Sequence, residues 1–385
     1  MKINMKEFDI KTKIYFGEDA LDRLRQLDYK NVMIITDPYV IHSGMIRLVE
    51  DKLKAAGIAY SVFSDVVPDP PIAKITLGVK ALKEASPDAV IAIGGGSAID
   101  SAKAIKEIYS KGNNLPSVPL IAIPTTSGTG SEVTAFSVIS DPEQGKKFPL
   151  ISDDMIPEEA ILDVEFVKSV PAEITANTGM DVLTHAIEAY VSKNNNEFSA
   201  ALAEKSVEIC GAFLLRSYLS NNDIHARTKM HVASCLAGLA FNSASLGINH
   251  SIAHALGAKF HIPHGRANAM VLPHVIEFNS DINKHSKSKK EYLPCVKKYI
   301  NLAKMLGLYN FNEITTVRAL VNWIQFMNKE MEIPTSISQC GIDKDEYMAS
   351  IDELADNALK DACTATNPRV PSKEDILKIL IDLYD

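Results

Sequence analysis

Five of the ten histidines lie between residues 250 and 274, and another, His185, follows an acidic residue at helical spacing. Asp181 and His185 lie four residues apart in TGMDVLTHAIEAY, and His250 and His254 have the same spacing in GINHSIAHALGAKFHIPHG. Residues four apart project from one face of a helix. His264 lies beyond a helix break expected at the proline of HIPHG. One carboxylate and several imidazoles from different helices can converge on one divalent ion.

A single histidine among alanines and leucines is more often a packed or capping residue than a ligand. Two spaced pairs and a nearby PHG turn make a metal site the better interpretation of the set. Nitrogen and oxygen donors without a thiolate suit Fe(II), Zn, Mn or Co. Three further histidines exceed a four-ligand site, and we expect them behind the ligands or at the surface: His261, His274 and His285. Three others have no spacing that suggests a partner: His42, His225 and His231.

A glycine-rich turn follows an apolar run in AVIAIGGGSAIDSAKAI. Glycines let a ligand approach the backbone, and the N–H groups that begin a helix attract a pyrophosphate. The turn Gly94-Gly95-Gly96-Ser97 is therefore a candidate phosphate site, although it matches neither G-x-G-x-x-G nor a Walker motif. The alternative is a plain strand-to-helix turn, in which Ser97 is the N-cap and Asp100 completes a capping box.

A second loop of small polar residues, PTTSGTGS at 124–131, follows the next apolar run. Ligands of open α/β sheets lie at the carboxyl ends of the strands, so we expect this loop beside the glycine turn. Asp37 ends the run NVMIITD and could bind a ribose while repelling a 2′-phosphate, which favours NAD over NADP. Asp37 before Pro38 also fits a helix N-cap, so both roles stay open.

The elements that must position these residues change in type along the chain. Short apolar runs alternate with helical patterns up to residue 125, which predicts a parallel α/β sheet with strands buried on both faces. Residues 131–163 predict a hairpin and edge strands. After Pro171 the spacing is helical. We expect an α/β dinucleotide-binding domain at 1–170 and an all-helical metal-binding and catalytic domain at 171–385.

Composition excludes several classes of protein. The 385 residues are 46% hydrophobic and 23% charged, as in a folded globular protein, and the net charge of −8 argues against nucleic acid as a partner. Five scattered cysteines predict neither disulfides nor a thiolate site, which fits the cytoplasm. No stretch approaches 18 apolar residues and the first ten lack a signal core, so we expect no membrane partner.

Four blocks of the sequence, joined by ALKDACTATNPR near the C-terminus, resemble the signatures of one family: GGGSAIDSAKAI, IPTTSGTGSEVT, NTGMDVLTHAIEAY and GINHSIAHALGAKFHIPHGRANAMVLPHV. They are similar to those of the iron-containing, group III alcohol dehydrogenases. The resemblance is greatest to the 1-propanol and ethanol dehydrogenases of propanediol and ethanolamine utilisation. It implies a dehydroquinate synthase-like fold with a cofactor domain, a metal domain and the substrate between them.

The resemblance also implies roles for particular residues. The implied metal ligands are Asp181, His185, His250 and His264. His254 matches an additional histidine beside the metal, where it either relays a proton or orients a ligand. The implied cofactor residues are Asp37, Gly94, Gly95, Gly96, Ser97, Asp100, Thr125, Thr126, Thr129, Thr134 and Lys147.

The implied reaction is reversible hydride transfer between NAD(H) and a short-chain primary alcohol or aldehyde, such as 1-propanol or ethanol, with Fe(II), or zinc, at the metal site. 1,3-propanediol or butanol dehydrogenase is an alternative within the family. A metal-dependent hydrolase without a dinucleotide is an alternative from another class. We further expect a homo-oligomer, a dimer or larger, in the cytoplasm or in a bacterial microcompartment.

Overall fold

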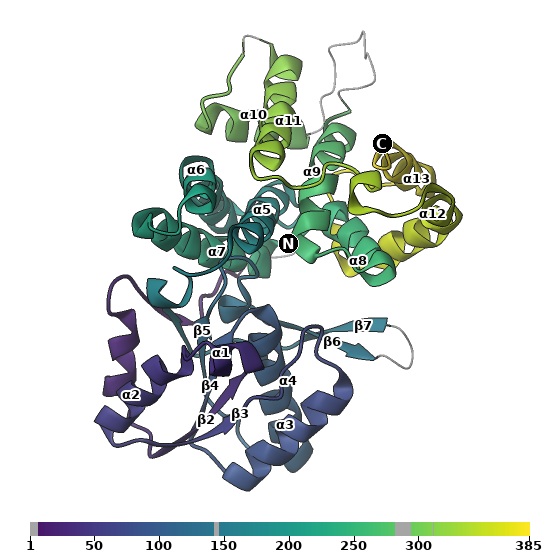
Figure 1. Ribbon diagram of the computed structural model, residues 1–385. Helices are drawn as coiled ribbons and strands as arrows, with labels where there is room; N and C mark the ends of the chain where they lie inside the picture. Colours follow the sequence, from purple (N-terminus) through teal and green to yellow (C-terminus); the bar gives the residue numbers. More distant parts are fainter. Residues whose placement is uncertain (1–6, 142–145, 282–293, 311) are drawn as a thin grey trace, which may run out of the picture. The chain divides into compact units, whose positions relative to one another are not determined.

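A computed structural model describes residues 7–141, 146–281, 294–310 and 312–385 (Figure 1). The chain divides into two compact units, Met1–Ser169 and Val170–Asp385. The first unit is α/β and the second is helical, so the fold class expected from the sequence is confirmed.

The first unit is built on a six-stranded sheet in which every neighbouring pair is parallel. Its strands are, in spatial order, β1 (Lys13–Phe16), β8 (Glu159–Leu162), β5 (Leu120–Pro124), β4 (Ala89–Gly94), β2 (Asn31–Thr36) and β3 (Ala59–Phe63). The helices of this unit are α1 (Pro38–His42), α2 (Ile46–Ala56), α3 (Ile72–Ala85) and α4 (Gly96–Asn113). A separate antiparallel hairpin joins β6 (Phe136–Asp141) to β7 (Lys146–Ile151).

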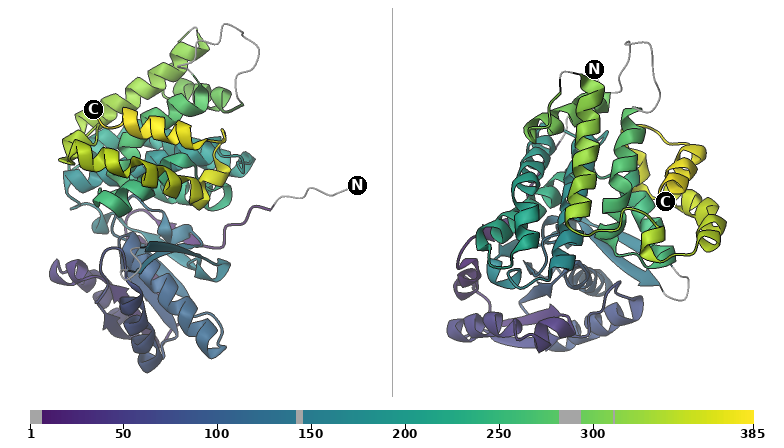
Figure 2. Two further views of the ribbon diagram at one scale, coloured as in Figure 1. Left: turned by 90° about the vertical axis from the view of Figure 1, so that its right-hand side faces the viewer. Right: turned by 45° about the horizontal axis from the view of Figure 1, so that its top comes forward.

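Helices cover both faces of this sheet (Figures 1 and 2). Val32 and Ile34 of β2 point into the cluster that contains α2, whereas Met33 and Ile35 point into the cluster that contains α3 and α4. Alternate residues of one strand thus enter two different cores. This explains why the central strands have unbroken apolar runs instead of alternating patterns.

The structure corrects two expectations for the strands. β8 lies between β1 and β5 in the interior of the sheet, although we expected residues 131–163 to supply a hairpin and edge strands. The hairpin is present as β6 and β7, but the edges are β1 and β3. Because β3 lies at an edge, it is not buried on both faces: Val62 is 40% exposed.

The second unit is a group of nine named helices within the described residues: α5 (Ala172–Val191), α6 (Glu197–Leu219), α7 (Ile224–Ala244), α8 (Ile248–Phe260), α9 (His264–Ser280), α10 (Pro294–Met305), α11 (Glu313–Glu330), α12 (Lys344–Lys360) and α13 (Lys373–Asp382). α5 packs on α6, α7 and α9, and α8 packs on α9 and α12. Across the described ranges, no single helix is both long and apolar enough to cross a bilayer. The bent pair α7 and α8 passes only by length and composition, and turns through 106°.

Helices α5 and α6 approach each other closely at Gly179. A Cβ added to this glycine would lie 2.1 Å from Leu214 Cδ1. We expect Gly179→Ala to destabilise the protein by about 1–3 kcal/mol, because the added methyl group overpacks this crossing. Urea unfolding followed by circular dichroism measures the change.

Gly112→Ala in α4 is the matched control, since a Cβ there meets nothing within 4 Å. We expect this variant to keep its stability or gain up to about 1 kcal/mol, because alanine favours helix more than glycine does. An equal loss of stability in both variants would contradict close packing as the cause.

Candidate metal centre and cofactor loops

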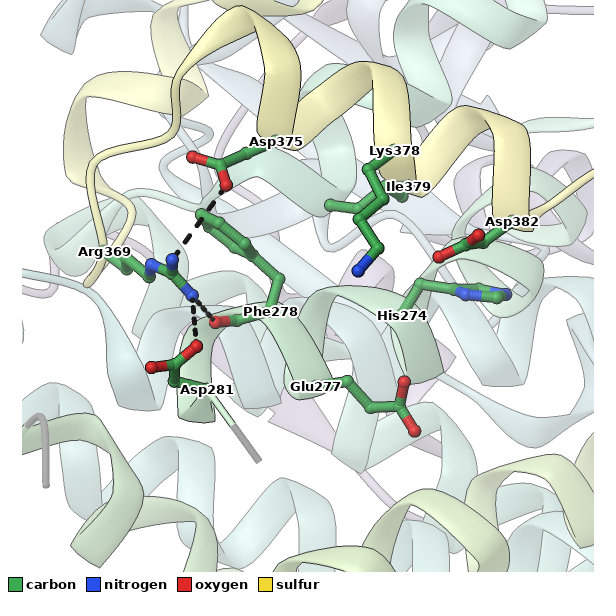
Figure 3. Close-up of a pocket in the computed structure, with 9 residues that line it drawn as sticks. All are labelled: His274, Glu277, Phe278, Asp281, Arg369, Asp375, Lys378, Ile379 and Asp382. Carbon is green, nitrogen blue, oxygen red and sulfur yellow. Dashed lines mark hydrogen bonds and ion pairs between the residues drawn. The ribbon is translucent and has the colours of Figure 1, made fainter. Parts of the chain in front are cut away.

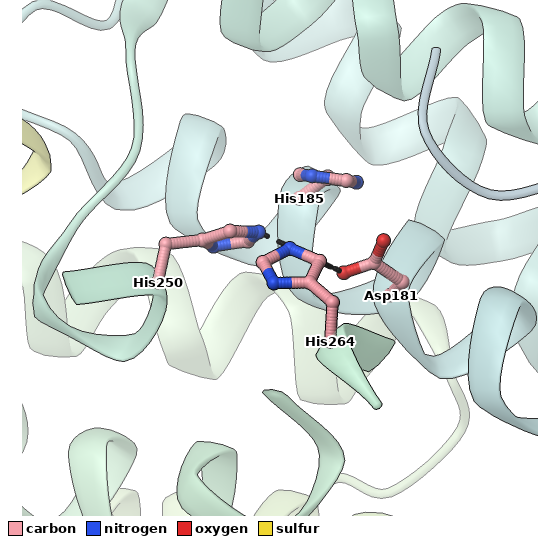
Figure 4. A group of neighbouring side chains, drawn as sticks. All are labelled: Asp181, His185, His250 and His264. Carbon is pink, nitrogen blue, oxygen red and sulfur yellow. Dashed lines mark ion pairs between the residues drawn. The ribbon is translucent and has the colours of Figure 1, made fainter. Parts of the chain in front are cut away.

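Three helices bring four side chains to one point of the second unit (Figure 4). Asp181 and His185 lie on α5, His250 on α8 and His264 at the start of α9, and one ligand atom from each lies within 4.8 Å of all the others. Asp181 Oδ1 lies 3.7 Å from His250 Nε2 and 3.6 Å from His264 Nε2. Donors bound to one ion at about 2.1 Å lie roughly 3–4 Å apart, so this set fits a divalent metal.

A glycine allows α9 to come close to α5. A Cβ on Gly265 would lie 2.1 Å from the carbonyl oxygen of Asn177, one turn before Asp181 in α5. α8 ends at Phe260 and α9 begins at His264 after Pro263, as the sequence predicts. The break at residues 261–263 therefore separates the two helices and places His264, the first residue of α9, against Asp181.

The exposure of the four side chains is unequal. The side chains of Asp181 and His250 are 5% and 1% exposed, whereas that of His264 is 42% exposed. His185 is 5% exposed and stacks between Phe241 and His250, with ring centroids 4.6 and 4.5 Å away. Of these four side chains, that of His264 is the most open to solvent.

Glu188 supports His250 from behind. Its Oε2 binds His250 Nδ1, and its Oε1 accepts a hydrogen bond from the Asn249 N–H at 2.8 Å. A carboxylate on the far nitrogen of a histidine ligand fixes the ring and directs its other nitrogen to the metal. Gly247 makes room for this carboxylate, since a Cβ there would lie 2.7 Å from Glu188 Oε1.

The charges around these ligands favour a cation. Burial lowers the pKa of His250, but the carboxylates of Glu188 and Asp181 outweigh burial and raise it to about 9. Burial raises the pKa of Asp181, but the three neighbouring imidazoles outweigh this effect and hold the pKa below its usual range. Asp181 is therefore an ionised carboxylate.

Asn268 joins the ligands to one another. Its Nδ2 donates to Asp181 Oδ1 at 2.7 Å and lies 3.1 Å from Nε2 of both His250 and His264. Its Oδ1 accepts from Asn249 Nδ2 at 2.9 Å, and Asn268 is completely buried. A buried amide with these partners ties α5, α8 and α9 together at the donor atoms.

His254 lies one helical turn after His250 and outside the group of four. Its ring stacks on that of His264 with centroids 5.3 Å apart, and its Nδ1 lies 2.8 Å from Asp361 Oδ2. Its side chain is 42% exposed. His254 is thus beside the candidate metal centre and open to solvent.

The other histidines lie elsewhere. His261 ends α8 with a left-handed backbone, His225 packs edge-on against Phe213, His231 is buried in α7, and His42 lies in α1. His285 lies outside the described residues.

His274 lines a small pocket between α9 and α13 (Figure 3). There Arg369 lies 3.5 Å from Asp281 Oδ1 and 4.0 Å from Asp375 Oδ1. These ion pairs join Arg369 to the end of α9 and to the first turn of α13, so the pocket has a structural explanation.

In the first unit, the glycine turn leads directly into α4. The N-cap of α4 is Gly95, and no described side chain caps it, so the alternative in which Ser97 caps α4 and Asp100 completes a capping box is wrong. Asp100 instead accepts from Ser131 Oγ at 2.6 Å and from the Val138 N–H at 2.9 Å. The first N–H groups of α4 thus lack a side-chain cap, as in helices that bind an anion at this end.

The second loop lies against this turn. Added Cβ atoms on Gly95 and Gly96 would lie 3.5 Å from Thr126 and 2.7 Å from Thr129. The Thr125 N–H donates to Gly94 O at 3.0 Å. The carboxyl ends of β4 and β5 therefore form one continuous surface of small residues.

Asp37 directly follows β2 and so lies, like the two loops, at the carboxyl ends of the strands. It caps α1 by accepting from the Val40 N–H at 3.0 Å through Oδ1, and a Cβ on Gly94 would lie 3.1 Å from its Oδ2. The N-cap role is therefore present, and the second carboxylate oxygen faces the glycine turn.

The structure does not place two further expected cofactor residues, Thr134 and Lys147, on this surface of small residues. Thr134 is 2% exposed, and its Oγ1 accepts from the buried Lys103 at 3.2 Å. Burial, partly offset by Asp100 and Glu132, lowers the pKa of Lys103 to about 8. Lys147 pairs with Ser140 in the hairpin, and its side chain lies outside the described residues.

Sequence reasoning missed Glu188, Asn268 and Asp361. The first two had a usable signal: Glu188 is three residues after His185, and Asn268 is four after His264, so each shares a helix face with a ligand. Asp361 is 107 residues from His254, and no local spacing links them.

We expect Glu188→Gln to weaken metal retention about 10–100-fold, because an amide holds the His250 ring less firmly than a carboxylate. The measurement is metal per chain after dialysis against graded chelator concentrations. Glu173→Gln on the same helix is the control, since Glu173 is 74% exposed and only pairs with Arg266. Equal retention by both variants would show that Glu188 does not support the site.

Known proteins resemble the chain along its whole length. Residues 11–164 match the family described as iron-containing alcohol dehydrogenase, and residues 175–384 match the C-terminal region of the Fe-containing alcohol dehydrogenase family. A 1-propanol dehydrogenase, PduQ, of Citrobacter freundii is 42% identical over 98% of this chain and 100% of its own. An NADPH-dependent butanol dehydrogenase of Clostridium saccharobutylicum is 38% identical over 99% and 98%.

A solved structure of 1,3-propanediol oxidoreductase superposes with a TM-score of 0.91 and 29% identity, covering 99% of this chain and 100% of its own. These matches do not support the hydrolase alternative. The four sequence blocks, the α/β and helical units and the relatives agree, and the chain belongs to the iron-containing alcohol dehydrogenases, a family of alcohol oxidoreductases.

Proposed function

We propose that this protein is an Fe(II)-dependent alcohol dehydrogenase that transfers hydride between NAD(H) and a short-chain primary alcohol or aldehyde. The observation that carries the proposal is the convergence of Asp181, His185, His250 and His264 in a chain of this family. Three imidazoles, one carboxylate and no thiolate form a donor set that suits Fe(II) and also accepts zinc.

In this proposal the first unit binds the cofactor. The start of α4 and the loop after β5 bind the pyrophosphate through backbone N–H groups and threonine hydroxyls. Because Gly95 and Gly96 have no side chains, the phosphates can come close to the backbone. Asp37 Oδ2 accepts from a ribose hydroxyl and opposes a 2′-phosphate at that position.

The second unit then holds the oxygen of the substrate. A divalent ion held by Asp181, His185, His250 and His264 would polarise the alcohol or aldehyde oxygen, and a bound nicotinamide would exchange the hydride. Asp181 stays ionised and neutralises part of the metal charge, while Glu188 holds the His250 ring in place. His254 passes the hydroxyl proton to water, since its ring lies beside His264 and is open to solvent.

The substrate class rests on the relatives. Relatives that match over nearly their whole length carry the names of 1-propanol and butanol dehydrogenases, and the superposed structure carries that of a 1,3-propanediol oxidoreductase. We therefore propose unbranched alcohols of roughly two to four carbons and their aldehydes.

Anaerobic reconstitution with Fe(II), followed by NADH oxidation, tests this function. We expect turnover with acetaldehyde, propionaldehyde, butyraldehyde or 3-hydroxypropionaldehyde, and loss of both metal and turnover in Asp181→Ala. Absence of turnover with all four aldehydes would overturn the proposed activity. Equal turnover with zinc would overturn only the preference for iron and would leave the proposed activity standing.

Cofactor choice has its own prediction at Asp37. We expect Asp37→Ser to raise the kcat/KM ratio of NADPH to NADH about tenfold, because serine retains a capping oxygen for α1 but removes the charge that repels a 2′-phosphate. Steady-state rates with each cofactor measure the ratio.

Asp223→Ser is the matched control, since Asp223 caps α7 by the same contact, accepting from the Ala226 N–H at 3.0 Å. Its ratio should equal that of the unchanged protein. If Asp37→Ser also leaves the ratio unchanged, Asp37 is a capping residue and does not select the cofactor.

A further inference from the structure

Asp361 and His254 form a carboxylate–imidazole pair outside the four candidate ligands. Asp361 follows the last residue of α12 and caps the short helix Ala362–Thr366, and its Oδ2 lies 2.8 Å from His254 Nδ1 on α8. The two residues are 107 positions apart in the sequence. The packing of α12 on α8 brings them together.

The chain holds this carboxylate in one orientation. Its Oδ1 accepts from the Cys363 N–H at 2.9 Å and from Ser251 Oγ at 3.2 Å. Ser251 Oγ is itself held by Thr364 Oγ1 at 2.8 Å. Because Oδ1 already binds the chain, Oδ2 is the oxygen directed at His254.

The chemistry of the pair fixes which nitrogen of His254 carries hydrogen. Burial raises the pKa of Asp361, but the bonds from His254 and the Cys363 N–H outweigh it and hold the pKa below its usual range. An ionised carboxylate only accepts hydrogen bonds, so Nδ1 must donate. In a neutral ring the Nε2 atom is then left as the acceptor.

We propose that Asp361 is a positioning residue, which holds the His254 ring in the orientation and tautomer that leave Nε2 free to take a proton. The inference rests on the proposed function, in which His254 relays the hydroxyl proton. In this role Asp361 acts through His254, whose Nδ1 lies 2.8 Å from its Oδ2.

A second metal ion is the competing explanation, since His254, Asp361 and Cys363 offer three donors within 4.8 Å of one another. Burial and the nearby carboxylates of Asp361 and Glu188 hold the pKa of the Cys363 thiol well above its usual value. The bond between His254 Nδ1 and Asp361 Oδ2 at 2.8 Å already uses one donor atom of each residue. The hydrogen-bonded pair therefore accounts for the geometry without a second ion.

A double-mutant cycle tests the proposal in the metal-loaded enzyme with Asp361→Asn, His254→Gln and the double variant. We expect each single variant to lower kcat about 10–100-fold, with metal content and the KM for the cofactor unchanged. The double variant should be no slower than His254→Gln, because Asp361 has no role without the ring. Ser251→Ala should lower kcat less than Asp361→Asn does. When combined with His254→Gln, it should lower kcat no further.

Asp343→Asn is the matched control. Asp343 caps the opposite end of α12, where it accepts from the N–H groups of Asp345 and Glu346 at 2.9 and 3.1 Å. We expect its kcat to match the unchanged protein. Full activity in Asp361→Asn, or multiplied losses in the double variant, would overturn the inference. So would a second metal equivalent per chain that Asp361→Asn removes.

A tautomer measurement separates this inference from the proposed function. In zinc-loaded protein labelled with ¹⁵N-histidine, the signal that His254→Gln removes should show hydrogen on Nδ1, and Asp361→Asn should change that pattern. Hydrogen on Nε2 with Asp361 intact would overturn the inference whatever the activity. Failure of the unchanged protein to oxidise NADH with any aldehyde, with hydrogen on Nδ1, would overturn only the proposed function.

Discussion

The close approach of two helix backbones is the constraint on which the metal centre depends. At Gly265 the start of α9 lies so near the carbonyl of Asn177 that no side chain fits between them. The same contact brings His264, the first residue of α9, to within 3.6 Å of Asp181. A shift of α9 by the width of a methyl group would separate His264 from Asp181. The helical unit therefore has to hold α5 and α9 in close contact, and it has to do so with polar ligand side chains buried between them.

Those polar groups bring a second constraint, since Asp181 and Glu188 are both nearly fully buried on one helix. Buried carboxylates are tolerated only with charged or hydrogen-bonding partners. Asn268 and the imidazoles supply them for Asp181, and His250 and the Asn249 N–H supply them for Glu188. A divalent ion at the four candidate ligands would add positive charge beside the buried Asp181 carboxylate. The residues that hold the ligands therefore also make a bound cation energetically acceptable.

The sequence predicted what local spacing encodes. The parallel sheet, the helical second unit and the convergence of Asp181 with His185, His250 and His264 follow from apolar runs, helical periodicity and family motifs. The interior place of β8 did not, because strand order depends on contacts between segments far apart in the chain. Nor could the sequence exclude Ser97 as the cap of α4, because Asp100 binds Ser131 and Val138, which lie on other segments of the chain.

Helix α8 carries two histidines, each bound through Nδ1 to a carboxylate, and burial sets their different tasks. The side chains of His250 and Glu188 are 1% and 3% exposed, whereas those of His254 and Asp361 are 42% and 22% exposed. The buried pair has little contact with solvent, whereas the pair at the surface keeps the same contact and has solvent beside it. In the proposed function, these similar contacts one helical turn apart therefore suit His250 to metal binding and His254 to proton exchange.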